Sequence, residues 1–314
     1  MNKIIKIDNL SKSYTIKSGL FSKKENIKVD ALKNISLEIY ECQTVGLIGL
    51  NGAGKSTLIK IILGILVQSE GNIEVFNKNP FKNRISNLYD IGVIFGQKTQ
   101  LRWDLSTMDS YKLNRALYDI PKEQFDVLLN KYSKILDLDD FINRPVRTLS
   151  LGQKMRADLL SALLHSPKLL ILDEATIGVD ILSKNKIIDL IKELKKNTTI
   201  IYTSHNLNEV YEISDRIVVL NKGTIILDKN KDELLNNVEY LGIKLYLKKP
   251  LKYDDLKFNE VKMIKVSEYE YTFRFIKKDI LKNFLDYIYS NNLIDYFEIN
   301  ENNLEKILKD VDNG

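Results

Sequence analysis

Short apolar runs alternate with amphipathic patterns along most of the chain. The runs that are rich in β-branched residues lie at residues 44–49, 71–76, 91–96, 168–174, 198–205 and 216–227. Such runs are typical of central strands in a mostly parallel sheet that is covered by helices on both faces. The pattern therefore predicts an α/β fold up to about Lys231.

One stretch inside this region has a different pattern. The β pattern stops over residues 101–148, where the segments 110–120 and 122–138 carry apolar side chains at three- and four-residue spacing. This spacing places the apolar side chains on one face of a helix. We expect residues 101–148 to form a helical insertion in the α/β domain.

The chain changes character again near Tyr240. From there the patterns read strand, strand, strand, helix, strand, helix, which suggests a small α+β unit. We therefore expect a main domain over residues 1–235 and a C-terminal accessory domain over residues 240–314. Dimer support, regulation and contact with a membrane subunit are all compatible with this accessory domain.

Composition adds few constraints. Of the 314 residues, 44% are hydrophobic, which is enough for one large core or two moderate ones. The longest apolar run, residues 61–67, is much shorter than the ~20 residues of a membrane-spanning helix, and the N-terminal segment lacks the features of a signal peptide. The single cysteine, Cys42, cannot form an internal disulfide, which fits a reducing cytoplasm.

The charge pattern does not favour a nucleic-acid partner. The net charge is +5, from 47 basic and 42 acidic residues, and the basic side chains are spread along the chain. A solvated surface explains this distribution better than a nucleic-acid patch does. The lysines between residues 17 and 28 could approach an anionic lipid, although a solvated loop accounts for them more simply.

The pattern G-x-x-x-x-G-K-S at residues 49–56 predicts a phosphate loop. It follows an apolar run and precedes a helical pattern, as a strand, loop and helix of this type require. Gly49, Gly52 and Gly54 let backbone N–H groups converge on phosphate oxygens at the helix N-terminus. Lys55 could then reach the β- and γ-phosphates, and the Ser56 hydroxyl could coordinate Mg²⁺.

Two carboxylates, Asp173 and Glu174, end the apolar run LLILDE at residues 169–174. Where a strand ends, both side chains can turn towards one cleft. In nucleotide hydrolases the first carboxylate usually supports Mg²⁺, while the second orients or deprotonates the attacking water. Helix capping is the alternative for these residues, and the phosphate loop favours the catalytic interpretation.

The segment LSLGQ at residues 149–153 resembles a second anion site. Ser150 stands at the N-cap of a predicted helix and the Gly152 amide lies nearby, which suits a phosphate group. The phosphate loop lies far upstream in sequence. The chain therefore carries two candidate anion sites that are far apart in the sequence.

The chain has two histidines. His205 ends the apolar run at residues 198–205, where the open edge of an α/β sheet binds ligands, so we expect a functional role for it. His165 lies near the end of a predicted helix, and we expect a structural role.

Together these segments resemble the nucleotide-binding domain of ABC transporter ATPases over roughly residues 3 to 235. The features that carry the resemblance are, in chain order, Tyr14, GLNGAGKST at 49–57, Gln97, LSLGQ at 149–153, LLILDE at 169–174, Asp180 and His205. The residues around these motifs are most similar to those of the ATPase subunits of type 2 ABC export systems. The resemblance implies a cassette with a mostly parallel sheet, an antiparallel β subdomain and a helical insertion.

The resemblance also implies roles for individual residues. ATP binding would involve Tyr14 on the adenine, the loop residues Gly49, Leu50, Asn51, Gly52, Ala53, Gly54, Lys55, Ser56 and Thr57, and Gln97. Mg²⁺ would be served by Ser56, Gln97 and Asp173. Glu174 would be the general base, with His205 and Lys55 on the γ-phosphate. Ser150, Gly152 and Gln153 would contact the ATP of the other protomer in a dimer, and Asp180 would couple the two sites.

Three of these residues have plain alternatives. Tyr14 could pack on its strand, because the chain has 16 tyrosines, and Gln97 could be an exposed turn residue. Trp103, the only tryptophan, follows Gln97 in the region where the family receives its membrane subunit. A single tryptophan is more often part of a core, so we expect burial.

The chain departs from the commonest family pattern at two positions. Leu151 stands where the signature usually has its first glycine, and Ala175 replaces the proline that usually follows the glutamate of LLILDE. Neither change removes a catalytic group. Leu151 would matter only if its side chain faced the nucleotide, and Ala175 removes some backbone stiffness.

The expected function is that of an ATP-hydrolysing subunit. It would bind ATP and Mg²⁺, pair with a second copy and drive a separate transmembrane permease subunit from the cytoplasmic side, with export as the direction. A ribosome-associated ATPase of the same type would carry two cassettes, and a DNA-maintenance ATPase would carry a long coiled coil between Thr57 and Leu149, where no heptads occur. A non-hydrolysing regulatory protein is disfavoured because Glu174 and His205 are both present.

Overall fold

The computed structural model divides into two compact units, Met1–Lys231 and Asp232–Gly314. The division therefore lies a few residues before the boundary that the sequence suggested. The structure describes residues 2–17, 26–96, 98–204, 206–231, 233, 241–248, 261–267, 269–275, 278–290 and 294–300.

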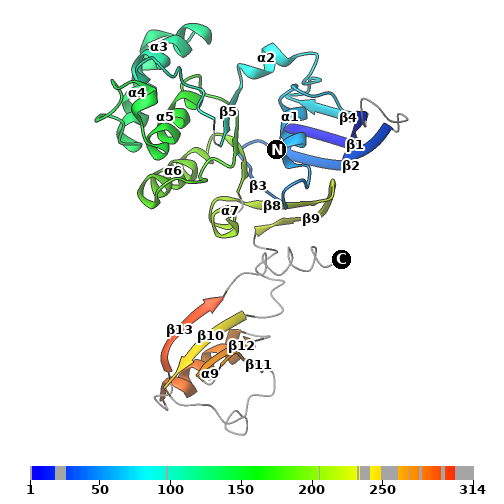
Figure 1. The fold of residues 1–314 in the computed structure, drawn as a ribbon, viewed down its shortest axis with the longest axis vertical. Coiled ribbons are helices and arrows are strands. Elements are labelled where there is room, and N and C mark those ends of the chain that lie inside the picture. The colour runs from blue at the N-terminus through cyan, green and yellow to red at the C-terminus, as the bar shows by residue number, and fades with distance from the viewer. Residues whose placement is uncertain are drawn as a thin grey trace. The chain divides into compact units, whose positions relative to one another are not determined.

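A six-stranded sheet forms the centre of the first unit (Figure 1). Its strands, in spatial order, are β5 (Ile91–Phe95), β6 (Leu169–Asp173), β7 (Thr199–Thr203), β3 (Thr44–Ile48), β8 (Arg216–Asn221) and β9 (Thr224–Asn230). All neighbours are parallel except β8 and β9, which form an antiparallel hairpin. Every residue of β3 and β7 is buried, as expected for central strands covered on both faces. The predicted α/β fold is confirmed.

Helices α1 (Lys55–Ile62), α6 (Ile181–Leu194) and α7 (Leu207–Ile213) follow β3, β6 and β7 of this sheet. The short helix α2 (Arg84–Leu88) precedes β5. α1 directly follows the phosphate loop, and α6 follows the turn after β6. α7 comes so close to β3 that a Cβ atom at Gly46 would lie 2.2 Å from Val210 Cγ1. The parallel strands thus end along one edge, where the loops before α1, α6 and α7 gather.

A second, antiparallel sheet completes the N-terminal part. It consists of β2 (Asn26–Tyr40), β1 (Lys3–Lys17) and β4 (Glu70–Val75), in that spatial order. The assignment of residues 71–76 to the mostly parallel sheet was wrong, because this run is β4. Only Ile73 and Val75 of β4 are buried, and this alternation is typical of an antiparallel strand with one solvated face.

The helical insertion lies at the side of the central sheet that carries β5 (Figure 1). It contains α3 (Thr107–Leu117), α4 (Lys122–Ile135) and the short 3₁₀ helix η1 (Val146–Thr148), and leads into α5 (Leu151–Leu163). The helical character predicted for residues 101–148 is therefore present. Tyr111 of α3 is fully buried and its hydroxyl donates to the Ala157 carbonyl of α5 at 2.9 Å, which joins the insertion to α5.

The second unit contains a four-stranded antiparallel sheet and a helix. Its elements are β10 (Leu241–Leu247), β11 (Val261–Lys265), β12 (Glu270–Phe275), α9 (Lys278–Ser290) and β13 (Ile294–Asn300), and the strand order is β11-β12-β10-β13. Phe284 of α9 packs on Phe273 of β12 with ring centroids 4.7 Å apart. The first five of the six predicted elements are present in the predicted order. The sixth, a helix near residues 302–311, lies outside the described residues.

Among the described helices, none combines the length and the apolar character that a membrane span requires.

Candidate functional site

The phosphate loop is pressed between β2 and the end of β8. Gly54 has a φ of 109° and is the N-cap of α1 without a side-chain cap. A Cβ atom there would lie 2.6 Å from the Ala31 carbonyl oxygen, and one at Gly49 would lie 2.4 Å from that of Leu220. Both positions therefore require glycine. The uncapped first turn of α1 leaves its N–H groups for an anion.

Lys55 provides a buried positive charge beside this loop. Its side chain is 6% exposed, and Nζ donates to the Gly49 carbonyl at 2.6 Å and to the Leu50 carbonyl at 3.3 Å. Burial lowers the pKa of Lys55, while the charges of Glu174 and Asp173 oppose this change. Within the described part of the chain no carboxylate forms an ion pair with Lys55, so this buried ammonium is poorly compensated. A phosphate group would supply the missing negative charge.

Asp173 and Glu174 lie at the carboxyl end of β6, next to Lys55. Burial raises the pKa of Asp173, and the charge of Glu174 acts in the same direction, whereas the hydrogen bond from Thr203 and the charge of Lys55 lower it. The three charged groups therefore interact, although they come from the two different loops at this edge of the sheet. The sequence had placed them in one cleft, and the structure brings them together.

A buried hydroxyl on β7 fixes both carboxylate residues. Thr203 is fully buried. Its Oγ1 donates to Asp173 Oδ1 at 2.7 Å and accepts the backbone N–H of Glu174 at 2.9 Å. Glu174 itself has a φ of 58°, a left-handed conformation that costs a residue other than glycine on the order of 1 kcal/mol. Thr203 stabilises this turn and so belongs to the site, although no sequence pattern indicated it.

We expect Thr203→Val to slow the predicted nucleotide hydrolysis by about tenfold, because the Asp173 carboxylate and the Glu174 turn would both lose a partner. The matched control is Thr199→Val at the other end of β7, where a buried threonine hydroxyl likewise accepts one N–H, from Cys42 at 3.0 Å, and donates to one carbonyl. Both variants should lose about 1–3 kcal/mol of stability. Steady-state kinetics and thermal unfolding measure the two effects, and equal rate losses would contradict a specific role for Thr203.

A second buried network lies behind the turn after Glu174. Glu209 of α7 accepts hydrogen bonds from Thr176 at 2.6 Å, from Tyr202 at 2.7 Å and from Ser204 at 3.2 Å, and forms an ion pair with Lys184 of α6. It joins the ends of β6 and β7 to α6 and α7. In the sequence, the only signal for this network is the acid Glu209, four residues after His205.

The signature segment forms the predicted helix start. Ser150 is the N-cap of α5, its Oγ accepts the Gln153 N–H at 3.2 Å, and the Gln153 side chain accepts the Ser150 N–H at 3.0 Å. This capping box leaves the N–H groups of Leu151 and Gly152 without an intrahelical acceptor. The start of α5 therefore has the free N–H groups that the predicted anion site requires.

Gly152 packs against the start of α6. A Cβ atom at Gly152 would lie 2.4 Å from Asp180 Oδ2 and 2.7 Å from Ser183 Oγ. Asp180 caps α6 by accepting the Ser183 N–H at 2.9 Å, and its hydrogen bonds with Ser183 lower its pKa. Leu151 is 41% exposed, and its Cδ2 lies 2.9 Å from the Cβ position of Gly178. The signature and Asp180 are therefore one local unit.

The structure keeps this unit away from the phosphate loop of the same chain. The neighbours of Gly152 are in α6, whereas those of Gly54 are in β2 and the turn at Gly223. In Figure 1, the central strands lie between α5 and α1. The two anion sites do not meet within one chain.

The structure describes two of the four remaining residues, Tyr14 and His165, but neither Gln97 nor His205. Tyr14 pairs with Val29, two residues before the Ala31 that contacts the phosphate loop, and is 36% exposed with Lys12 Nζ 5.3 Å from its ring centroid. Gln97 and His205 lie outside the described residues. His165 stacks on the Tyr118 ring at 4.3 Å, and burial lowers its pKa, which fits a structural role.

The expectation that Trp103 belongs to the core was wrong. Its side chain is 55% exposed, with Lys154 Nζ 4.6 Å from the ring centroid. A cation over an aromatic face stabilises such a ring outside a core. The alternative that the sequence left open, a surface residue available for contact, fits the structure better.

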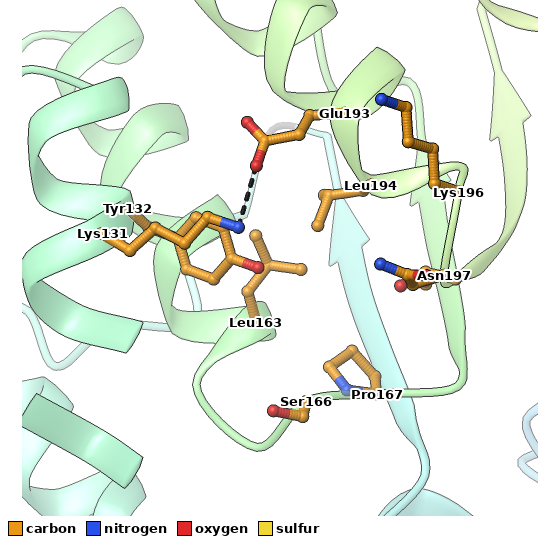
Figure 2. Close-up of a pocket in the computed structure, with 10 residues that line it drawn as sticks. Lys131, Tyr132, Leu163, Ser166, Pro167, Glu193, Leu194, Lys196 and Asn197 are labelled. Carbon is orange, nitrogen blue, oxygen red and sulfur yellow. Dashed lines mark ion pairs between the residues drawn. The ribbon is translucent and has the colours of Figure 1, made fainter. Parts of the chain in front are cut away.

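A pocket of about 380 Å³ opens at the opposite edge of the central sheet. Pro167 and Thr198, which precede β6 and β7, line it, so it lies at the amino ends of the strands. Figure 2 shows Lys131 of α4 facing Glu193 of α6 across it, and their ion pair measures 2.8 Å. The pocket belongs to the junction between the insertion and the core, away from the phosphate loop.

The side chains near the loop suit Mg²⁺ held together with a nucleotide. Within the ranges that the structure describes, no three His, Cys, Asp or Glu side chains form a metal cluster. Mg²⁺ is usually bound by one or two carboxylates, waters and substrate phosphates rather than by a protein cage. Asp173, half-buried beside the loop, and Ser56, exposed in the first turn of α1, offer this kind of donor set.

Comparisons with known proteins agree with this geometry. The ABC transporter family model matches residues 32–177. The ABC transporter ATP-binding protein NatA of Bacillus subtilis is 31% identical over 210 residues, which cover 67% of this chain and 85% of NatA. The lantibiotic transport ATP-binding protein SrtF of Streptococcus pyogenes is 35% identical over 241 residues, covering 74% of this chain and 96% of SrtF.

A solved structure has the same fold. The dimeric ATP-binding cassette MJ0796 in a post-hydrolysis state, bound to ADP and Pi, superposes with a TM-score of 0.63 at 24% identity. The match covers 72% of this chain and 98% of that chain.

Proposed function

The chain belongs to the family of ABC transporter ATP-binding proteins, and we propose that it hydrolyses ATP with Mg²⁺ in a dimer that drives a separate membrane subunit. It is the ATP-binding, ATP-hydrolysing type of subunit of such transporters. The observation that carries the proposal is the convergence of Lys55, Asp173 and Glu174 beside a loop that requires glycine.

Each residue of this group has a distinct task in the proposal. The N–H groups of the loop and Lys55 bind the phosphates, and Tyr14 covers the adenine. Glu174 accepts the proton of the attacking water, held in place by the Thr203 contact with its N–H. Mg²⁺, when bound, neutralises charge on the phosphates, with Ser56, Asp173 and Gln97 as its protein donors. His205 completes the site at the γ-phosphate.

The separation of the two anion sites supports a two-fold dimer. Each ATP would lie between the phosphate loop of one protomer and Ser150, Gly152 and Gln153 of its partner, so that one dimer has two composite sites. Asp180, which caps α6 beside Gly152, would couple them. Closure is then a population shift driven by the extra contacts that ATP makes in the closed state.

Ser150→Arg tests the composite site. A bulky cation at the start of α5 should abolish the ATP-dependent dimer, while the ATP dissociation constant changes by less than about threefold, because the phosphate loop is intact. The matched control is Ser106→Arg, because Ser106 caps α3 with the same kind of hydrogen bond, from Asp109 N–H at 3.0 Å. Light scattering and calorimetry measure the two quantities. An unchanged dimer in Ser150→Arg would contradict the arrangement in trans.

The membrane partner and the direction of transport rest on the relatives. SrtF is named for lantibiotic transport, and we propose export from the cytoplasmic face for this chain as well. No nucleic acid is needed in this scheme. Co-purification with a membrane protein of about six apolar segments of ~20 residues each would support the proposal. A protein that hydrolyses ATP but binds only ribosomes or DNA would contradict it.

A further inference from the structure

Asp158 is a buried carboxylate on α5 that has no role in the catalytic scheme. Asp158 is 4% exposed. Its Oδ1 accepts the Thr99 hydroxyl at 3.1 Å and the Gln100 N–H at 2.9 Å, and the Leu101 N–H also donates to the carboxylate. A carboxylate is stable at this depth only with such donors. All three donors belong to one segment, residues 99–101, which follows Gln97.

α5 holds the same segment at a second point. Lys154 precedes Asp158 by four residues, so both side chains lie on one face of the helix. The Lys154 ammonium lies over the Trp103 ring. The Trp103 carbonyl also accepts the Arg147 N–H at 3.0 Å. Residues 99–103 are thus held on α5 through two side chains.

These contacts connect two parts of the proposed site. In the sequence, the segment 99–103 begins two residues after Gln97, and α5 begins with the signature. We propose that Asp158 is a positioning residue that clamps the segment after Gln97 to α5, so that displacement of this segment moves the signature with it. The consequence for hydrolysis rests on the proposed function, whereas the clamp is a property of the chain alone.

The clamp should respond to pH. Burial raises the pKa of Asp158 to about 6, against the opposing effects of its hydrogen bonds with Gln100, Thr99 and Leu101 and of the Lys154 charge. Among the described residues, the buried Tyr111 of α3 also faces Asp158. Above this pH the ionised carboxylate accepts all three donors. Below it, the carboxyl group carries a proton and loses acceptor strength, so the clamp loosens.

Trp103 is the only tryptophan in the chain, so intrinsic fluorescence reports on this segment directly. In the full-length protein without nucleotide, we expect acrylamide quenching of Trp103 to rise as the pH falls, with a midpoint near 6. Asp158→Asn should abolish this transition. Thr99→Val should move the midpoint upward, because the lost hydrogen bond favours the ionised form. Asp126→Asn, an exposed acid of α4, should change nothing.

The effect on hydrolysis is a separate measurement. Asp158→Asn should leave the ATP dissociation constant within about twofold and lower kcat by about tenfold at neutral pH, because the phosphate loop is intact and the signature is misplaced. A wild-type protein with no Trp103 transition, or a Thr99→Val midpoint that stays in place, would overturn the clamp. A retained transition in a protein that does not hydrolyse ATP would overturn the proposed function and leave the clamp standing.

Discussion

Glu174→Gln should bind ATP normally and hydrolyse it at least about a hundredfold more slowly, because the amide cannot accept the proton of the attacking water. The backbone should stay in place. The Glu174 N–H bonds to Thr203 Oγ1 at 2.9 Å and to the Thr203 carbonyl at 3.1 Å, and glutamine keeps both bonds. The left-handed φ of 58° costs glutamine about as much as glutamate.

The same variant should accumulate the closed dimer. Hydrolysis normally ends the closed state, so a slow enzyme with intact binding shifts the population towards it. Light scattering with MgATP would show a dimer in Glu174→Gln and mainly monomer in Glu123→Gln, an exposed acid in the first turn of α4. Near-normal turnover in Glu174→Gln would exclude Glu174 as the general base.

The parts of the site that the sequence predicted are local. The phosphate loop, the LLILDE strand end and the Ser150 cap each lie within a few consecutive residues, so spacing and residue type are enough to specify them. The capping box between Ser150 and Gln153 is the clearest case, because both partners belong to the first turn of one helix.

The parts that the sequence did not predict depend on pairing between distant segments. Thr203 reaches Asp173 only because β6 and β7 pair in parallel, with these two residues opposite each other. Asp158 reaches residues 99–101 through the packing of α5 against the insertion. Neither partner could be inferred from residue type alone, because a threonine at a strand end and an acid within a helix have many ordinary environments.

The two wrong expectations have the same origin. Residues 71–76 have the β-branched content of a central strand, but β4 buries only alternate side chains against β1. A single tryptophan is typical of a core, yet the contact with Lys154 holds Trp103 at the surface. In both cases burial was decided by tertiary neighbours rather than by the residue type.

Lys55→Met should abolish most ATP binding without unfolding the protein. Burial lowers the pKa of Lys55, which means that the charged form is disfavoured in the nucleotide-free site. Methionine has similar length and no charge to desolvate, and this gain offsets the lost hydrogen bonds to the carbonyls of Gly49 and Leu50. We therefore expect the free energy of unfolding at neutral pH to change by less than about 1 kcal/mol.

The affinity for ATP should fall by about tenfold to a hundredfold, because a charge-assisted bond to phosphate contributes about 1.5–3 kcal/mol and the buried site offers no water in its place. Lys60→Met is the matched control, since it removes the same charge from an exposed position of α1 and should change the affinity by less than about threefold. Calorimetry with ATP and thermal unfolding separate the two effects. Comparable affinity losses in both variants would mean that general positive charge attracts ATP, whereas a stable, non-binding Lys55→Met protein identifies the buried ammonium as the phosphate contact.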